Sequence, residues 1–238
     1  MALWQVYVAS QGSLLAPGPW GVARGSVHLL GDAETWSALW TSNQALLVGF
    51  AASVVIGVPL GLAMGRFRRL ELLADGWLSI MLVTPMAMII PLLIIVFGFS
   101  LTARSVVVAL FAMPMVTINC RAGVREVDPI LVEMARTMGA SELVVWRRVL
   151  LPASSPALWA GLRIGIGRAI TGMVIVELLL VAVGVGRLIQ EFRGSFETDR
   201  LYALVLIIVV ESLVLVSAMK ALERKLIPWA SDSVGARR

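Results

Sequence analysis

The sequence contains very little cysteine, histidine and charge. Cys120 is the only cysteine and His28 the only histidine among 238 residues, so one chain can assemble neither a disulfide framework nor a Cys/His metal cluster. Only 15% of the residues are charged, and only two of the 20 basic residues are lysines. The P-loop pattern Gly-x-x-x-x-Gly-Lys-Ser/Thr does not occur, which excludes the usual cradle for ATP phosphates.

Apolar side chains, in contrast, are abundant. They make up 59% of the residues, and the mean hydropathy is +0.90, which is more apolar surface than a soluble domain of this length can bury. The net charge of +5 would suggest nucleic-acid binding in a soluble protein. Here the basic residues flank long apolar runs, as membrane topology requires. The sequence therefore predicts an all-α membrane protein.

Uncharged or nearly uncharged stretches predict about five membrane spans. These stretches cover residues 45–65, 76–103, 105–120, 157–183 and 201–219. Pro85 and Pro91 interrupt the second stretch, so we expect a kinked or broken helix there. No internal repeat or low-complexity linker divides the chain, which indicates a single membrane domain over residues 41–222.

The distribution of basic residues predicts the orientation of the chain. Residues 66–69, 121–148 and 220–238 carry most of the arginines and both lysines, whereas the arginines between 187 and 200 are offset by three acidic residues. Basic connections lie on the cytoplasmic side of a membrane. We therefore expect residues 121–152 and a tail of residues 223–238 in the cytoplasm, and an extracytoplasmic segment over residues 1–40.

The predicted cytoplasmic connection contains start and stop signals for two short helices. Asp128 and Pro129 favour a helix start, and Gly139 favours a stop. Ser141 and Glu142 favour a second start, and Pro152 is expected to close the unit. The side chains expected on one face of the first helix are Leu131, Met134, Ala135 and Met138. By spacing alone, such a unit is either a simple connection or a knob that docks into a partner.

The same segment resembles the signature loop of binding-protein-dependent ABC transporter permeases. That loop is written Glu-Ala-Ala, three residues, Gly, nine residues, Ile, any residue, Leu-Pro. It is matched with every spacing kept by Glu133, Met134, Ala135, Gly139, Val149, Leu151 and Pro152. Met134 and Val149 are conservative departures from the commonest residues.

The resemblance extends over residues 15–229 and is strongest to the nitrate, sulfonate and taurine group of permeases. It is carried by LVEMARTMG (131–139), LLPA (150–153), GLRIGIGR (161–168), the stretch 177–186 that ends in GVG, and LERKLIPW (222–229). Members of this group usually have a further N-terminal span. Leu3, Trp4 and Gln5 look like its outer end, so residues 1–40 are interpreted as containing a remnant of that span.

The resemblance implies a fold, a set of partners and a cargo. The fold is that of a type I, MetI-like importer permease. Its partners would be two copies of a separate ATPase that binds ATP and Mg²⁺, a second permease copy and an extracytoplasmic solute-binding protein. The chain itself would hold no cofactor and would lie in the bacterial inner membrane. The cargo would be a small anion such as a sulfonate, taurine or nitrate, or a related organic acid.

The resemblance also implies roles for residues of the loop. Glu133 would anchor and orient a coupling helix that seats in the ATPase. Ala135 and Ala140 would permit close approach, Gly139 would make the bend, and Pro152 would set the return into the membrane. The predicted coupling residues are therefore Glu133, Met134, Ala135, Gly139, Ala140, Val149, Leu151 and Pro152.

Candidates for the translocation path lie inside the spans. An ionisable group there is a functional candidate by default, which singles out Glu177 for the translocation path or a seam between two permeases. The alternatives are a helix-end carboxylate that pairs with Arg163 or Arg168 and one that reaches toward the outer interface. Pro85, Pro91 and Asn119 are further candidates. Glu211 is a weaker one, because it could pair with Arg104 or Lys220.

Small residues at four-residue spacing predict close helix packing. They form two ladders, Gly57, Gly61 and Gly65 in the first span and Gly161, Gly165 and Ala169 in the fourth. Such ladders allow helix backbones to approach closely. We interpret both as structural features.

Two other functional classes fit the sequence less well than a permease. A secondary transporter or channel driven by an ion gradient predicts inverted repeats and several intramembrane acids, and the sequence shows no evident repeat and few such acids. An intramembrane enzyme is disfavoured because the only histidine, His28, lies outside the predicted spans.

Overall fold

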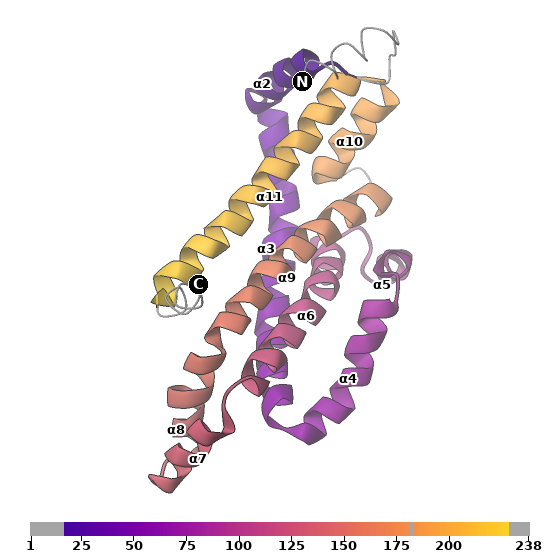
Figure 1. Cartoon of the computed structure of the whole chain (residues 1–238). Helices are drawn as coiled ribbons and strands as arrows, with labels where there is room; N and C mark the ends of the chain where they lie inside the picture. The colour runs from indigo at the N-terminus through magenta and orange to yellow at the C-terminus, as the bar shows by residue number, and fades with distance from the viewer. Residues whose placement is uncertain (1–16, 181–182, 229–238) are drawn as a thin grey trace.

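The computed structural model describes residues 17–180 and 183–228, and within these residues the chain is helical and has no strand. Figure 1 shows long helices packed side by side, with α7 and α8 at one end and α2 and α10 at the other. The first half contains α2 (Pro19–Leu30), α3 (Ala33–Arg66), α4 (Arg68–Val83), the 3₁₀-helix η1 (Met86–Met88), α5 (Ile90–Phe97) and α6 (Leu101–Arg125). The second half contains α7 (Pro129–Thr137), α8 (Glu142–Val145), the π-helix η2 (Trp146–Leu150), α9 (Leu151–Leu180), α10 (Gly184–Gly194) and α11 (Thr198–Leu226).

Among the described residues, three single helices and two bent pairs are long and apolar enough to cross a membrane. α3, α6 and α11 qualify alone. α4 with residues 86–97 qualifies as a pair bent by 84°, and residues 142–179 with α10 qualify as a pair bent by 50°. The predicted five stretches fall on these five units. α3 begins well before residue 45, because Asp32 caps its first turn and accepts a hydrogen bond from the Glu34 amide at 3.2 Å.

The break between α4 and α5 confirms the predicted interruption by proline. α4 ends at Val83, Pro85 precedes η1, and Pro91 occupies the first turn of α5. Proline has no amide hydrogen and clashes with the preceding helical turn, but it fits the first turn of a new helix. The two prolines therefore separate two helices where the hydropathy alone shows one stretch.

Helix α6 packs against both α3 and α9 through glycines. A Cβ on Gly57 of α3 would lie 3.0 Å from Thr117 Oγ1, and a Cβ on Gly165 of α9 would lie 2.6 Å from Val116 Cγ2. Glycine at these positions allows close contact between backbones. The interpretation of both glycine ladders as packing features is confirmed.

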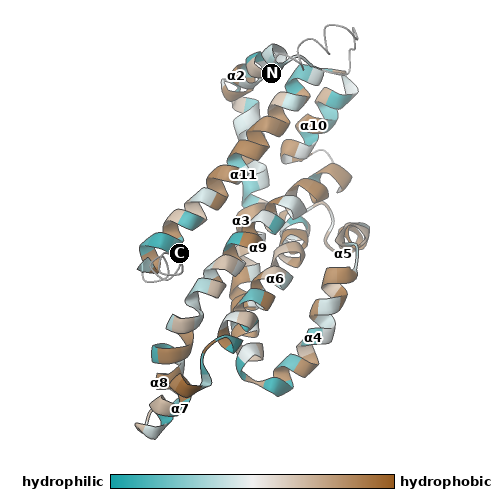
Figure 2. Ribbon diagram, viewed as in Figure 1, coloured by the Kyte–Doolittle hydropathy of each residue, from teal (hydrophilic) through white to brown (hydrophobic). Residues whose placement is uncertain are grey.

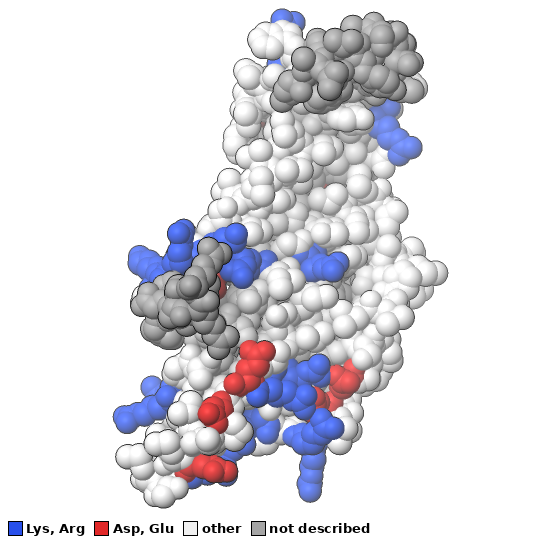
Figure 3. Space-filling model, in the orientation of Figure 1, with Lys and Arg blue, Asp and Glu red and all other residues white. Residues whose placement is uncertain are grey.

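Apolar side chains cover much of the outside of the helix bundle. Trp40, Val55, Trp77, Ile95 and Leu213 are each at least 60% exposed. Figure 2 shows hydrophobic residues along much of the long helices, and Figure 3 shows acidic and basic side chains together at the end that carries α7 and α8, with other basic side chains further along the molecule. An outside of this kind suits hydrocarbon rather than water. The prediction of an all-α membrane protein is confirmed.

The short helix α2 was not predicted. It lies in the segment interpreted as extracytoplasmic and packs against α11, where a Cβ on Gly25 would lie 3.1 Å from the Asp199 carbonyl oxygen. Its twelve residues are too few to cross a membrane. The residues proposed as the remnant of a further span, Leu3 to Gln5, and most of the predicted tail lie outside the described residues.

Candidate functional site

The predicted two-helix loop connects α6 to α9 at one end of the bundle (Figure 1). The first helix, α7, begins at Pro129, and the Asp128 carboxylate accepts a hydrogen bond from the Ile130 amide at 2.9 Å. This contact satisfies an amide that has no partner within the helix. The predicted start of the first helix is confirmed.

The bend after α7 is a Schellman motif. Gly139 has a φ of +78°, in the left-handed region that glycine adopts without steric cost. The Gly139 amide donates to the Arg136 carbonyl at 2.9 Å, and the Ala140 amide donates to the Ala135 carbonyl at 3.0 Å. Both bonds satisfy carbonyls at the helix end. The predicted helix stop at Gly139 is therefore confirmed by the backbone, and a part for Gly139 in coupling stays a prediction.

The inner side of the loop packs on a small apolar cluster. Its buried members are Val124, Val127, Val145 and Leu150, and the partly buried Ala135, Ala140 and Val149 pack against them. Small side chains let α7 lie close to the rest of the loop. The close approach that the two alanines allow is thus seen within the loop itself, and a contact of either with a partner stays a prediction.

The outer side of the loop carries exposed apolar side chains, which we call the apolar outer face. It consists of Ile130, Leu131, Met134, Met138 and Leu143, which are 46–86% exposed. Ala135 was expected on the same face but lies on the inner side. Exposed apolar clusters outside the membrane mark interaction surfaces. This face can bury its side chains only against another molecule.

Glu142 ties the loop to the end of α3. Its carboxylate accepts from Arg66 and from Arg136, each at 2.9 Å. The hydrogen bond from Arg136, with a further contribution from Arg66, lowers the pKa of Glu142. The sequence assigned Glu142 only to a helix start. A carboxylate beside a bend is visible in the sequence, but its partner Arg66 comes from another helix, so the contact could not be predicted.

Glu133 was expected to anchor the first helix of the loop, but within this chain it does not do so. Its side chain is exposed and makes no hydrogen bond or ion pair with the part of the chain that the structure describes. It borders a cavity of about 360 Å³ that Arg66, Arg125 and Arg136 also line. Anchoring within the chain comes from Glu142, and a contact of Glu133 with a partner stays a prediction.

Pro152 does not close the loop, which corrects the prediction. The second helix runs from α8 through the π-helix η2 directly into α9, and Leu151 and Pro152 occupy the first turn of α9. Proline cannot donate a hydrogen bond within a helix, and a wider π turn accommodates such an interruption without ending the helix. One continuous helix therefore leads from the loop into the span formed by α9.

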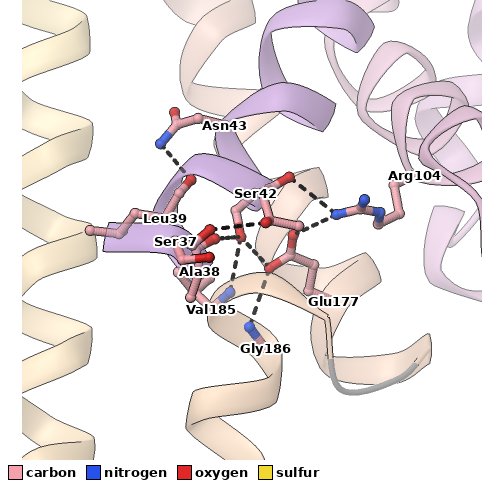
Figure 4. A network of polar contacts seen from close by, with 10 residues as sticks. Ser37, Ala38, Leu39, Ser42, Asn43, Arg104, Glu177, Val185 and Gly186 are labelled. Carbon is pink, nitrogen blue, oxygen red and sulfur yellow. Dashed lines mark hydrogen bonds and ion pairs between the residues drawn. The ribbon is translucent and has the colours of Figure 1, made fainter. Parts of the chain in front are cut away.

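At the far end of the bundle, Glu177 of α9 lies in a closed polar network (Figure 4). Its carboxylate accepts from Ser42 of α3 at 2.7 Å and from the Gly186 amide of α10 at 3.2 Å. Arg104 of α6 lies 3.4 Å from the other oxygen and also donates to the Thr41 carbonyl at 3.2 Å. The Glu177 side chain is completely buried. A buried charge is tolerated only with such compensation.

Two glycines make room for this network. Gly184 has a φ of +61°, and a Cβ there would lie 2.9 Å from both Glu177 carboxylate oxygens. A Cβ on Gly186 would lie 2.5 Å from the Glu177 carbonyl oxygen. The Glu177 carboxylate thus meets the Gly186 amide in the first turn of α10, where a helix favours negative charge. The network joins α3, α6, α9 and α10.

The structure gives both intramembrane acids partners other than those named in the structural alternatives. Glu177 pairs with Arg104 rather than Arg163 or Arg168, and Glu211 accepts a hydrogen bond from Asn43 rather than pairing with Arg104 or Lys220. These partners lie far away in the sequence, so spacing could not identify them. A place for Glu177 on the translocation path stays a prediction.

The other path candidates lie apart from Glu177. Pro85 and Pro91 are exposed at the break between α4 and α5. Asn119 donates to the Met115 carbonyl of its own helix at 2.8 Å, and its Cβ would lie 2.6 Å from a Cβ on Gly161. Asn119 therefore belongs to the seam between α6 and α9, and the structure does not bring the candidates together.

Comparisons with known proteins agree with this architecture. Residues 54–228 match the family described as binding-protein-dependent transport system inner membrane component. The taurine transport system permease protein TauC of Escherichia coli is 30% identical over 201 residues, which cover 84% of this chain and 73% of TauC. The riboflavin transport system permease protein RibX of Chloroflexus aurantiacus is 30% identical over 234 residues, which cover 98% of this chain and 87% of RibX.

The fold also matches a solved structure. An inward-facing structure of the MetNI methionine ABC transporter aligns with a TM-score of 0.67 at 20% identity, covering 82% of this chain and 98% of that chain. This similarity confirms the predicted MetI-like fold. Because the family match spans most of the sequence, the chain belongs to the binding-protein-dependent transport system inner membrane components, the permease subunits of ABC importers.

Proposed function

We propose that the chain forms the translocation path for a small anionic solute and couples that path to a separate ATPase through residues 128–152. The observation that carries the coupling is the apolar outer face. Its five side chains project from a loop that is braced from behind by an apolar cluster and by Glu142. A rigid projection with an uncovered apolar surface suits a partner's groove.

The proposed assembly contains two copies of this permease, two ATPases and an extracytoplasmic binding protein in a bacterial inner membrane. ATP and Mg²⁺ would be bound by the ATPases. Closure of the ATPases would move the two loops, and each loop would pass this motion to α9 through the continuous helix that begins at Glu142. Rigid-body motion of packed helices is the usual form of such a transition.

The anionic class of the solute rests on the resemblance to the nitrate, sulfonate and taurine group. One relative is named for taurine, which carries a sulfonate, and another is named for riboflavin. Relatives of similar identity thus carry different names, and the solute is set chiefly by the binding protein. A small sulfonate or carboxylate is the solute class we propose.

The test is reconstitution with the partner subunits. The permease is purified with the ATPase and the solute-binding protein encoded beside it, and uptake of the binding protein's ligand is measured in proteoliposomes. We expect the ATPase to copurify and uptake to require ATP. Uptake by the permease alone, abolished by an ionophore and indifferent to ATP, would instead identify a secondary transporter and overturn the proposal.

A further inference from the structure

Arg168 lies near the middle of α9 and has no partner among the described residues. It belongs to α9, is exposed, and makes no hydrogen bond or ion pair with any residue in the ranges 17–180 and 183–228. The preceding arginine of the same helix, Arg163, does have a partner, since it pairs with Glu223 at 2.6 Å. Arg104, in the first turn of α6, pairs with Glu177. An unpaired charge inside a bilayer is costly and marks a functional site.

The depth of Arg168 follows from the neighbouring helix. Arg168 lines a cavity together with Leu110, Phe111, Pro114 and Met115 of α6. These residues lie at the centre of α6 (Leu101–Arg125), in a stretch of residues 105–120 that has no charge. Lipid headgroups lie at the two surfaces of the hydrocarbon layer. No lipid headgroup therefore lies at the depth of the Arg168 guanidinium.

The cavity beside Arg168 opens at the break between α4 and α5. Its other lining residues are Met81, Leu82, Thr84 and Met86, which flank Pro85 where the helix is interrupted. Its volume is about 190 Å³, below the roughly 300–1,000 Å³ of pockets for drug-sized ligands. One cation, one hydroxyl and an otherwise apolar lining suit a small molecule with a single anionic group.

A second copy of the chain does not readily supply the missing charge. The acidic side chains of the described spans that lie away from the charged ends are Glu177 and Glu211. Glu177 is completely buried in its own network, and Glu211 accepts from Asn43 in a separate groove between α3 and α11. The counter-ion that best fits Arg168 is therefore brought by the solute.

We infer that Arg168 and the cavity at the α4–α5 break form a transient binding site for the anionic group of the solute as it crosses the membrane. The guanidinium supplies charge-assisted hydrogen bonds to a sulfonate or carboxylate. Thr84 lies in the same lining, and the methionine side chains adapt to the apolar part of the solute. This inference rests on the proposed function and adds to it the site within the permease.

The first experiment measures binding to the purified permease–ATPase complex. Thermal unfolding is followed with ethanesulfonate and propionate as anionic probes and propionamide as the neutral control, at matched ionic strength. We expect both anions to raise the midpoint and propionamide to leave it unchanged. Arg168→Gln should weaken the anion effect about 10- to 100-fold, the range expected for losing a charge-assisted hydrogen bond, and Arg168→Lys should retain most of it.

Arg163→Gln is the matched control, because it removes an arginine from the same helix whose partner is a protein side chain. It should lower the unfolding midpoint without changing the response to the anions. No stabilisation of the wild type by either anion, or an equal response of Arg168→Gln and wild type, would overturn the inference.

The second experiment tests whether aqueous solutes reach this position. Arg168→Cys is introduced in a Cys120→Ala background and treated in proteoliposomes with a sulfonate-bearing thiol reagent. Reaction that ATP turnover accelerates supports the site, whereas an inert cysteine, as expected for a position facing lipid or a permanent seam between copies, contradicts it. Copurification of the ATPase with ATP-driven uptake that Arg168→Gln leaves unchanged would refute this inference alone and leave the proposed function intact.

Discussion

The two ends of the permease differ in whether their key side chains are covered by the rest of the chain. At one end, the loop of residues 128–152 leaves five apolar side chains uncovered and holds them in place from behind. At the other end, Glu177 has every contact supplied within the chain, and its side chain is completely buried. An uncovered surface is adapted to meet a partner and can be altered without unfolding the bundle. A closed polar network fixes four helices and tolerates little change.

The largest effect is expected in the closed network. Arg104→Gln would leave the Glu177 carboxylate buried without its cation, which costs about 3–5 kcal/mol for a broken buried pair. The unfolding midpoint of the detergent-purified protein should fall steeply. The double variant Arg104→Gln/Glu177→Gln is the control and should recover part of the loss, because no charge is then left unpaired. A fall in the double variant that equals the sum of both single variants would show that the pair does not interact.

The next effect concerns the bend of the loop. Gly139→Val forces a β-branched residue to a φ of +78°, at a cost of about 1–3 kcal/mol. We expect transport to fall at least about tenfold, because the loop loses the geometry that presents its apolar outer face, while the unfolding midpoint of the bundle changes little. Gly76→Val is the matched control, since Gly76 is helical and has open space around it. Normal uptake by Gly139→Val would remove the bend from the coupling mechanism.

A smaller effect is expected at Glu142. Its side chain is 44% exposed, and exposed ion pairs contribute only about 0.2–1 kcal/mol. Glu142→Gln should therefore leave the fold stable and reduce the number of solute molecules carried per ATP hydrolysed. Arg136→Gln, which removes only the contact within the loop, should have the weaker effect if the bond to α3 matters. Equal effects of Glu142→Gln and Arg136→Gln would show that Glu142 acts through its contact with Arg136 alone and that its bond to Arg66 of α3 is not needed.

The same carboxylate predicts a dependence on pH. Because the pKa of Glu142 is lowered in the folded protein, its ionised form stabilises the loop at every pH above the ordinary glutamate range. This contribution is lost as the pH falls through the lowered value. Amide hydrogen exchange in α7 and α8 should be constant around neutral pH, after correction for intrinsic rates, and should increase only in acid below that range. In Glu142→Gln this increase should be absent.

The sequence predicted the parts of the structure that depend on near neighbours. The cap at Asp128 and the bend at Gly139 involve contacts within a few residues, so composition and spacing reveal them. The break at Pro85 and Pro91 was also predictable, because a proline interrupts the helix in which it lies. Hydropathy located the spans but not the early start of α3, whose first turns are polar and are held by the Asp32 cap.

The remainder could not be predicted because it depends on tertiary contacts. Arg104 lies 73 residues before Glu177, and Arg66 lies 76 residues before Glu142. Nothing in the local pattern distinguishes these partners from Arg163, Arg168 or other arginines. The prediction that Pro152 closes the loop was wrong, because a proline usually interrupts a helix. Here the π-helical turn of residues 146–150 lets the helix continue through Pro152.

The most direct test is the affinity of the purified ATPase for the permease when the apolar outer face is made charged. Met138 is the most exposed member at 86%, and Met138→Glu should weaken binding at least about tenfold without lowering the unfolding midpoint, because surface substitutions change stability by only about 0.5 kcal/mol. Leu226→Glu, at an exposed position near the end of α11, should bind like the wild type. Unchanged affinity of Met138→Glu would contradict the assignment of this face as the docking surface.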